Sequence, residues 1–298
     1  MNQKIIFQNS KISLSIKRDD LLHPHISGNK FRKLKYNITS AQEQNQSRIL
    51  TFGGAFSNHI VAVAAAGKQY GLKTIGVIRG EELASQIEDN PSLKFAQDCG
   101  MILEFVSRAH YRQKNTAEAL EFWHKKYGSF YLLPEGGTNE LAVKGCQEIL
   151  TPADVDFDYI CCSVGTGGTI SGIINSAMPH QKIIGFPALK GDFLPEDIRN
   201  FTDRKNWELC PDYHFGGYAK VTPELIQFLN DFYAQHHIPL DPIYTGKMVF
   251  GVLDLIEKNY FKNGSTILLI HTGGLQGIKG INKILVQKNQ PQITYYEN

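Results

Sequence analysis

Residues 49–59 read Ile-Leu-Thr-Phe-Gly-Gly-Ala-Phe-Ser-Asn-His, and this stretch indicates the fold. The short apolar run at 49–52 predicts a buried strand, and the glycines and polar residues of 53–58 predict the turn after it. An apolar helix is then expected over 59–70, where Gly71 ends it. A buried strand followed by a glycine turn and a helix is typical of a βαβ unit, from which parallel sheets are built.

The same order of elements recurs along the chain. Strands are expected at 12–16, 74–78, 101–106, 130–133, 159–163, 182–186 and 266–270. Helices are expected at 92–99, 117–127, 223–234 and 249–258. One further helix is expected to begin at residue 31, and another is expected to follow the loop at 165–169 and to run through residue 177. This alternation predicts an α/β protein with mainly parallel sheets. We expect two interleaved lobes, a smaller α/β lobe of residues 42–150 and a larger lobe of residues 1–41 and 151–298.

Composition excludes several classes of protein. The 298 residues are 42% hydrophobic, enough for a large core, and 31 basic against 29 acidic residues argue against nucleic-acid binding. No apolar run is long enough to cross a membrane, and no secretory signal is recognisable, so we expect a cytoplasmic protein. Five cysteines without zinc-ligand spacing are expected to be core thiols, with no metal site.

The start of the helix near residue 31 carries an unusual crowd of cations: Lys30, Arg32, Lys33 and Lys35, with Asn29 as the expected N-cap. The partial positive charge of a helix N-terminus disfavours cations and favours anions. Two functional readings follow: the turn attracts an anion such as phosphate, or its field lowers a lysine pKa so that a neutral amine attacks a carbonyl. The alternative is a solvated basic helix start.

A glycine loop at 165–169 follows a predicted strand and precedes a helix, a position where backbone N–H groups can hold a phosphate. It is not a Walker loop, because no Gly-Lys-Ser/Thr follows. It also lacks the third glycine or alanine of a dinucleotide fingerprint, since Ile170 stands there. A small cofactor's phosphate and a plain tight turn both remain open from the loop alone.

Five motifs appear in order, at 27–33, 53–59, 134–138, 241–247 and 271–274. Together they resemble the pyridoxal-phosphate enzymes of fold type II, specifically the family of 1-aminocyclopropane-1-carboxylate (ACC) deaminase and D-cysteine desulfhydrase. The resemblance spans nearly the whole chain. It implies a two-lobed, tryptophan-synthase-β-like, three-layer α/β/α fold whose larger lobe binds pyridoxal 5′-phosphate, and it implies a homodimer.

The resemblance also implies roles for individual residues. Lys30 would carry the cofactor as a Schiff base, and Lys33 would help to hold its phosphate. The rest of the expected cofactor site comprises Asn58 at the phenolic oxygen, Thr272 at the pyridine nitrogen, and the phosphate loop Gly165, Thr166, Gly167, Gly168 and Thr169. The expected catalytic residues are Lys30, Ser57, Tyr218 and Tyr244. The expected substrate-binding residues are Ser57, Asn58, His59, Tyr218, Tyr244 and Thr245.

Two positions bear on the substrate. Thr245 stands where the resembled ACC deaminases have glutamate, and His59 stands where they have glutamine. A hydroxyl at the ring nitrogen, as expected of Thr272, leaves that nitrogen largely neutral and makes the ring a weaker electron sink, which suits elimination. The resemblance therefore favours β-elimination of a small D-amino acid, with D-cysteine giving pyruvate, ammonia and hydrogen sulfide. ACC deamination to 2-oxobutyrate and ammonia is the alternative.

Other readings stay open from the sequence. The loop at 165–169 is closer to that of cysteine-synthase-like enzymes, and the chain looks shorter than its relatives between 82 and 91, so another β-substituted D-amino acid is possible. A nucleotide-binding oxidoreductase needs an acidic residue about twenty positions beyond its glycine loop, and residues 187–189 offer none. A catalytically silent pyridoxal-phosphate-binding module is a further alternative.

Overall fold

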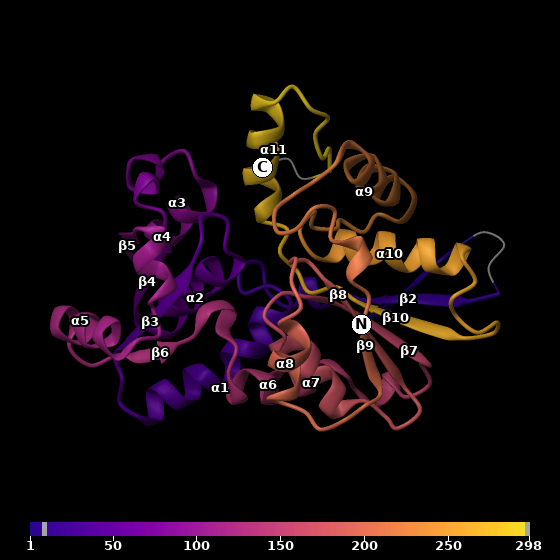
Figure 1. The fold of residues 1–298 in the computed structure, drawn as a ribbon, viewed down its shortest axis with the longest axis horizontal. Helices are drawn as coiled ribbons and strands as arrows, with labels where there is room; N and C mark the ends of the chain where they lie inside the picture. Colours follow the sequence, from indigo (N-terminus) through magenta and orange to yellow (C-terminus); the bar gives the residue numbers. More distant parts are fainter. Residues whose placement is uncertain (8–10, 296–298) are drawn as a thin grey trace.

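The structure is a computed structural model that describes residues 1–7 and 11–295, and its two sheets lie at opposite ends of the long axis (Figure 1). In spatial order, the six-stranded sheet contains β1 (Asn2–Ile5), β2 (Ser13–Lys17), β10 (Thr266–Ile270), β7 (Tyr159–Val164), β8 (Lys182–Pro187) and β9 (Trp207–Leu209). Only β1 is antiparallel to its neighbour. The all-parallel second sheet contains β5 (Ile102–Val106), β4 (Lys73–Arg79), β3 (Arg48–Gly53) and β6 (Tyr131–Leu133). The α/β prediction is confirmed.

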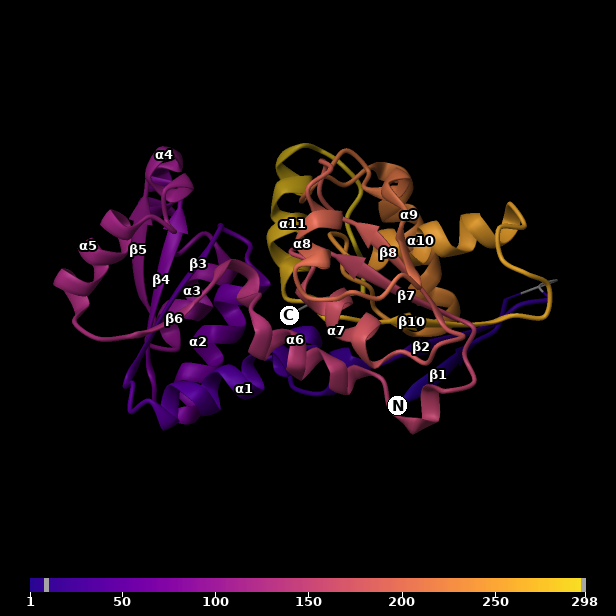
Figure 2. The same ribbon diagram turned by 60° about the horizontal axis from the view of Figure 1, so that its bottom comes forward.

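Helices cover both faces of the four-stranded sheet (Figure 2). Ile49 of β3 packs on the side of α1 (Asn29–Glu43), α2 (Asn58–Tyr70) and α3 (Pro91–Asp98). Leu50 and Phe52 point to the other face, toward α4 (Arg108–Arg112) and α5 (Ala117–Tyr127). Because side chains alternate along a strand, an apolar run buried on both faces is what a parallel sheet between helices requires.

The six-stranded sheet is built in the same way. Cys161 and Leu269 pack toward α9 (Pro223–His236), α10 (Thr245–Glu257) and α11 (Gly277–Gln287). Cys162 and Ile270 face the opposite layer, which holds α6 (Glu140–Cys146), α7 (Gly168–Ser176) and α8 (Leu194–Arg199). The three-layer α/β/α prediction is therefore confirmed for this sheet.

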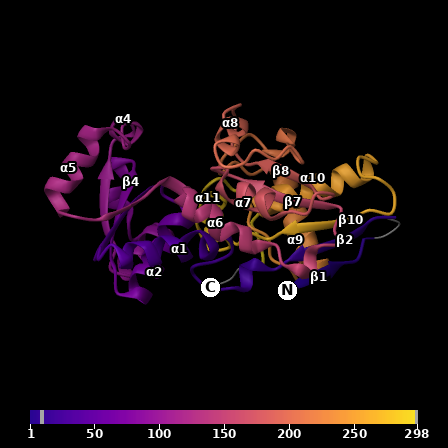
Figure 3. The same cartoon turned by 90° about the horizontal axis from the view of Figure 1, so that it is seen from below.

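Helices α1 and α6 pack side by side between the two sheets (Figure 3). Their contact is close, because a Cβ at Gly145 of α6 would lie 2.0 Å from the carbonyl oxygen of Arg32. A second link joins α11 to the segment before α3, where Lys283 Nζ lies 2.7 Å from Asp89 Oδ1. The division into lobes at residues 42 and 150 stays a prediction, although all strands of the smaller sheet lie between Arg48 and Leu133.

The five cysteines are free thiols, and Cys146, Cys161 and Cys162 are buried as expected of core residues. Cys99 and Cys210 are only partly buried. Within residues 1–7 and 11–295, no helix combines the length and the apolarity needed to cross a membrane.

Candidate active site

A cavity of about 380 Å³ opens at the carboxyl ends of strands from both sheets, where α/β proteins commonly bind ligands. Of the site residues predicted from the sequence, twelve line it: Lys30, Lys33, Ser57, Asn58, His59, Gly165, Thr166, Gly167, Thr169, Tyr218, Tyr244 and Thr272. Two do not. Gly168 is buried at the start of α7, and Thr245 is fully buried at the start of α10.

Helix α1 begins at the cavity, directly after a glycine. The helix begins at Asn29, and the residue before it, Gly28, has φ +57°. A Cβ on Gly28 would lie only 1.9 Å from the carbonyl oxygen of Thr272, so this crossing requires glycine. The predicted N-cap at Asn29 is wrong, because the Asn29 amide instead donates to Thr169 Oγ1 at 2.8 Å. That hydrogen bond ties α1 to the glycine loop.

The cations of α1 divide into two groups, and the outer group is paired with acids. Arg32 Nε lies 3.4 Å from Asp19 Oδ2, and Lys35 Nζ lies 2.7 Å from Glu148 Oε1. The solvated alternative therefore fits Lys35, whose ammonium is exposed. It does not fit the two lysines that face the cavity.

Lys30 and Lys33 form the inner group. Lys33 Nζ donates to Thr138 Oγ1 at 2.8 Å and to the Gly136 carbonyl at 3.0 Å, and Lys30 Nζ lies 3.4 Å from the same carbonyl. Burial, and then the charge of Lys33, lower the pKa of Lys30 to about 7; burial also lowers the pKa of Lys33. Neither ammonium has a carboxylate partner among the described residues. Buried cations are usually paired, so this wall is suited to an anionic ligand.

The glycine loop supplies hydrogen-bond donors opposite these lysines. Gly167 has φ +77° and precedes α7, and the backbone N–H groups of residues 165–169 have no acceptor among the described residues. Thr166 Oγ1 lies 3.5 Å from Lys33 Nζ. Free N–H groups at a helix N-terminus beside a buried ammonium make an anion site. The structure thus gives the loop the geometry that a phosphate site needs.

His59 presents an unpaired acceptor at the cavity wall. Thr51 Oγ1 donates to the Leu133 carbonyl at 2.8 Å, so its contact of 2.7 Å with His59 Nε2 requires the imidazole to donate there. His59 Nδ1 is then the acceptor nitrogen, and it is buried with no partner in the described part of the chain. Burial and the nearby lysines lower the pKa of His59 well below its usual value, so the ring is neutral.

Hydroxyl groups surround Thr272 at the floor of the cavity. Ser163 Oγ lies 3.2 Å from Thr272 Oγ1, and Thr245 Oγ1 lies 3.4 Å from it on the other side. Among the described residues, no carboxylate contacts the Thr272 side chain. The floor therefore offers neutral hydrogen-bonding groups and no negative charge.

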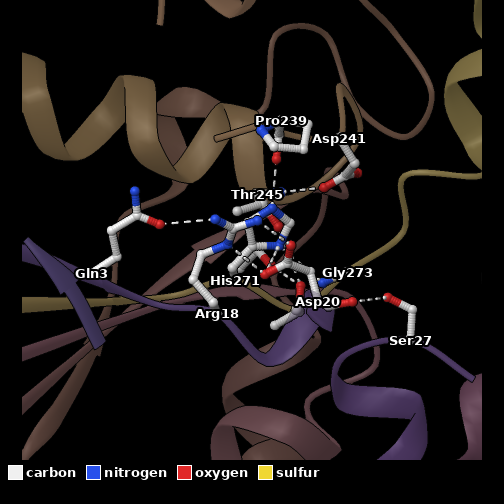
Figure 4. Close-up of polar contacts among 11 residues, drawn as sticks. Gln3, Arg18, Asp20, Ser27, Pro239, Asp241, Thr245, His271 and Gly273 are labelled. Atoms are coloured by element: carbon white, nitrogen blue, oxygen red, sulfur yellow. Dashed lines mark hydrogen bonds and ion pairs between the residues drawn. The ribbon is translucent and has the colours of Figure 1, made fainter. Parts of the chain in front are cut away.

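A buried polar network below the floor fixes the two segments that carry these hydroxyls (Figure 4). Asp241 accepts from the backbone N–H groups of Thr245, at 2.7 Å, and Tyr244, at 2.9 Å, which sets the start of α10. His271 donates through Nε2 to the Pro239 carbonyl at 2.7 Å, while its Nδ1 accepts from the Gly273 N–H at 3.1 Å. Because both nitrogens are occupied, His271 has a structural role.

The two predicted active-site tyrosines meet edge to face. The ring centroids of Tyr218 and Tyr244 are 6.1 Å apart. Burial raises the pKa of both phenols, so each keeps its proton. Lys247 Nζ donates to the Gly217 carbonyl at 2.9 Å and so fixes the backbone next to Tyr218.

Four residues of this region had no role in the sequence analysis: Arg79, Glu135, Thr138 and Ser163. Thr138 and Glu135 belong to the motif at 134–138, so that motif could have indicated that these two residues lie in the site. Ser163 ends a predicted strand next to the glycine loop. Nothing in the sequence around Arg79 distinguishes it from a surface cation.

Comparison with known proteins gives consistent results. The family described as pyridoxal-phosphate dependent enzyme matches residues 4–273. A Pyrococcus horikoshii protein that bears the provisional name 1-aminocyclopropane-1-carboxylate deaminase is 31% identical over 279 residues, 88% of this chain and 84% of that protein. The mitochondrial bifunctional D-cysteine desulfhydrase/1-aminocyclopropane-1-carboxylate deaminase of Arabidopsis thaliana is 30% identical, over 89% of this chain and 73% of its own. The crystal structure of an ACC deaminase homologue superposes with a TM-score of 0.83 at 27% identity, covering 96% of this chain and 93% of the other.

Proposed function

Because the chain belongs to the ACC deaminase and D-cysteine desulfhydrase family of pyridoxal-phosphate-dependent enzymes, we propose that it catalyses β-elimination of a small D-amino acid. D-cysteine is the proposed substrate, giving pyruvate, ammonia and hydrogen sulfide. The observation that carries this choice is the floor of the cavity, where the hydroxyls of Thr245 and Ser163 flank Thr272 and no carboxylate of the described residues contacts the Thr272 side chain.

The residues of the cavity fit the cofactor. Lys30 has a pKa lowered to about 7, so a large fraction of its amine is neutral and nucleophilic near neutral pH. Lys33 is a buried cation without an acidic partner among the described residues, and it lies beside the free N–H groups of 165–169. We assign the aldehyde end of the cofactor to Lys30 and its phosphate to Lys33 and the loop. The chemistry supplied by bound pyridoxal phosphate is an electrophilic carbonyl and an electron sink.

The helix α2 is suited to hold the substrate carboxylate. Ser57 Oγ accepts from the N–H of Ile60, which leaves the N–H groups of Asn58 and His59 without an acceptor among the described residues. A carboxylate at these two groups gains the favourable field of the helix N-terminus. We propose that Ser57 and Asn58 orient the substrate there.

Proton transfer falls to Lys30. With its amine free, Lys30 Nζ would be the base that removes the proton from the α-carbon of the substrate, and its lowered pKa would let it act near neutral pH. The thiol of cysteine has a pKa of about 8.5, so the thiolate can leave without a strong acid. Tyr218 and Tyr244, with raised pKa values, act as protonated hydrogen-bond donors that orient the substrate.

The floor supports the choice of elimination in this proposal. A carboxylate at the pyridine nitrogen would keep that nitrogen protonated, whereas the hydroxyls of Thr272 and Thr245 do not stabilise the positive charge. In the resembled ACC deaminases, glutamate stands at the position of Thr245. Since Thr245 Oγ1 is already 3.4 Å from Thr272 Oγ1, a longer acidic side chain at 245 would bring a carboxylate to this floor.

A product assay tests the proposal. Purified enzyme loaded with cofactor is offered D-cysteine and ACC separately, and sulfide with pyruvate is measured against 2-oxobutyrate. We expect sulfide and pyruvate from D-cysteine. Prominent 2-oxobutyrate from ACC would instead establish the runner-up function, ACC deamination, and silence on both would direct the search to other D-amino acids. A cytoplasmic homodimer completes the proposal from the family resemblance, and sedimentation velocity measures the oligomeric state.

A further inference from the structure

Arg79 is a cation in the cavity that the proposed mechanism leaves without a role. It is the last residue of β4, and Ile78 before it pairs with Gly53 of the adjacent strand β3. A Cβ built on Gly54 would lie 3.6 Å from an Arg79 guanidinium nitrogen, so the side chain lies over the turn that leads into α2. Arg79 is exposed and lines the same cavity as Ser57 and Tyr218.

The guanidinium has no acidic partner. Across the described residues, no carboxylate lies within ion-pair distance of Arg79, and its recorded contact is with an aromatic ring: Cζ lies 5.7 Å from the centroid of Tyr111. Stacking on an aromatic face leaves the N–H fork of arginine free for a planar anion. The N–H groups of Arg79 are therefore available to an anion in the cavity.

The acids that line the cavity do not fill this role. Glu135 is engaged elsewhere, because Oε1 accepts from the Tyr111 hydroxyl at 2.7 Å and Oε2 lies 3.1 Å from Lys114 Nζ. Asp197 lies beside Gly167 in the glycine loop, on the side assigned to phosphate. Neither of these two acids forms an ion pair with Arg79.

This charge is separate from the group assigned to the α-carboxylate. The N–H groups at the start of α2 follow strand β3, whereas Arg79 ends the neighbouring strand β4. Because these two strands are neighbours, both groups reach the same end of the cavity. We propose that Arg79 binds a second anionic group, a carboxylate carried on the β-carbon of the ligand, so that the site accepts, besides D-cysteine, β-substituted amino acids with an acidic side chain. This inference rests on the proposed function.

Binding measurements on the holoenzyme test this inference without turnover. D-aspartate and D-asparagine have nearly the same shape and differ in one charge, and neither carries a β-leaving group. We expect calorimetric titration to give a dissociation constant for D-aspartate that is at least about tenfold lower than that for D-asparagine. A hydrogen-bonded pair of charges provides a difference of this size. Arg79→Gln should remove this preference by weakening D-aspartate alone, and Arg79→Lys should retain part of it. The L-enantiomers are titrated in parallel, so that a preference for L-aspartate over L-asparagine would also be detected.

A matched control is available in the same lobe. Arg108 is exposed and pairs with Glu82 at 3.0 Å outside the cavity, so Arg108→Gln should leave both dissociation constants unchanged. Equal affinity of the wild type for aspartate and asparagine in both enantiomers would overturn the proposal. Equal weakening of both ligands by Arg79→Gln would also overturn it, by assigning Arg79 to the α-carboxylate. A product assay with D-cysteine on the same preparation separates the two proposals: absent pyruvate with intact aspartate preference contradicts only the elimination reaction.

Discussion

The wall and the floor of the cavity differ in their charge. The wall holds two lysines, Lys33 buried and Lys30 partly buried, with no acidic partner among the described residues, whereas the floor holds the hydroxyls of Thr272 and Ser163, with that of Thr245 buried behind Thr272. A buried cation without a partner is unfavourable unless a ligand brings the anion. A floor without charge is favourable by itself and leaves the ligand's own protonation unaltered. In the function proposed above, the charged wall would hold the cofactor and the uncharged floor would tune its chemistry.

Removing the reactive amine of the wall should give the largest effect. Lys30→Ala takes away both the covalent attachment of the cofactor and the proposed base, so turnover should fall at least about a thousandfold. Borohydride reduction followed by peptide mass spectrometry should find labelled Lys30 in the wild type and no labelled lysine in the variant. An active variant that still binds the cofactor covalently would sink the assignment.

The pH dependence of cofactor attachment sharpens the role of the wall. The neutral amine of Lys30 is the reactive form, and its pKa is lowered to about 7, so its fraction rises with pH and levels off above that value. The rate at which apoenzyme takes up pyridoxal phosphate covalently should rise about a hundredfold from pH 5 to pH 8, as the fraction of neutral amine does. Stopped-flow absorbance measures this rate. An increase that continues to pH 10 would mean an ordinary lysine.

Lys33 tests whether the wall holds a phosphate. Lys33→Met keeps the length of the side chain and removes the charge, so the affinity for pyridoxal phosphate should fall about tenfold or more. Pyridoxal, which lacks the phosphate, should lose much less affinity than pyridoxal phosphate. Fluorescence titration of the apoproteins measures the two affinities. The same substitution should raise the pKa of Lys30, because the Lys33 charge helps to lower it.

Charging the floor should change the selectivity by a smaller amount. Thr245→Glu would bring a carboxylate to Thr272 and favour a protonated ring, so turnover of D-cysteine relative to ACC should fall several-fold. Thr245→Ser, which keeps the hydroxyl, is the control and should preserve the ratio. Steady-state rates with both substrates measure it. An unchanged ratio in a folded Thr245→Glu protein would show that the charge of the floor does not determine the selectivity.

The outer cations of α1 should matter least. Lys35 is exposed and pairs with Glu148, so Lys35→Gln should cost roughly 0.2–1 kcal/mol of unfolding free energy, the range for exposed pairs. Urea denaturation measures this cost. Cofactor affinity and turnover should not change, and a loss of either would show that the inner and outer groups act together.

Much of the fold follows from local sequence patterns. Helix α5 has the predicted bounds Ala117–Tyr127, because Thr116 caps its start and Gly128 ends it. Helix α6 was not predicted, and its sequence contains Gly145, which weakens a helix locally but lets α1 approach closely. Strand β9 is only three residues long at the edge of the sheet and carries too little periodicity to detect. Tertiary packing decides these elements.

The site shows the same division. Lys30 and the glycine loop at 165–169 stand out because each breaks a local rule or follows a strand. Their convergence could not be derived from spacing, since Lys33 and Thr138 are far apart in sequence and meet only through the packing of α1. Arg79 had no local signal. Only the contacts of the surrounding acids show that no carboxylate of the described residues pairs with Arg79.

The protonation of the cofactor's ring nitrogen tests the central claim most directly. Holoenzyme prepared with pyridoxal phosphate that is isotopically labelled at this nitrogen can be examined by nitrogen NMR near neutral pH. We predict the chemical shift of a neutral pyridine, because Thr272, Thr245 and Ser163 provide only hydroxyl groups. The shift of a protonated pyridinium in the wild type would contradict the account.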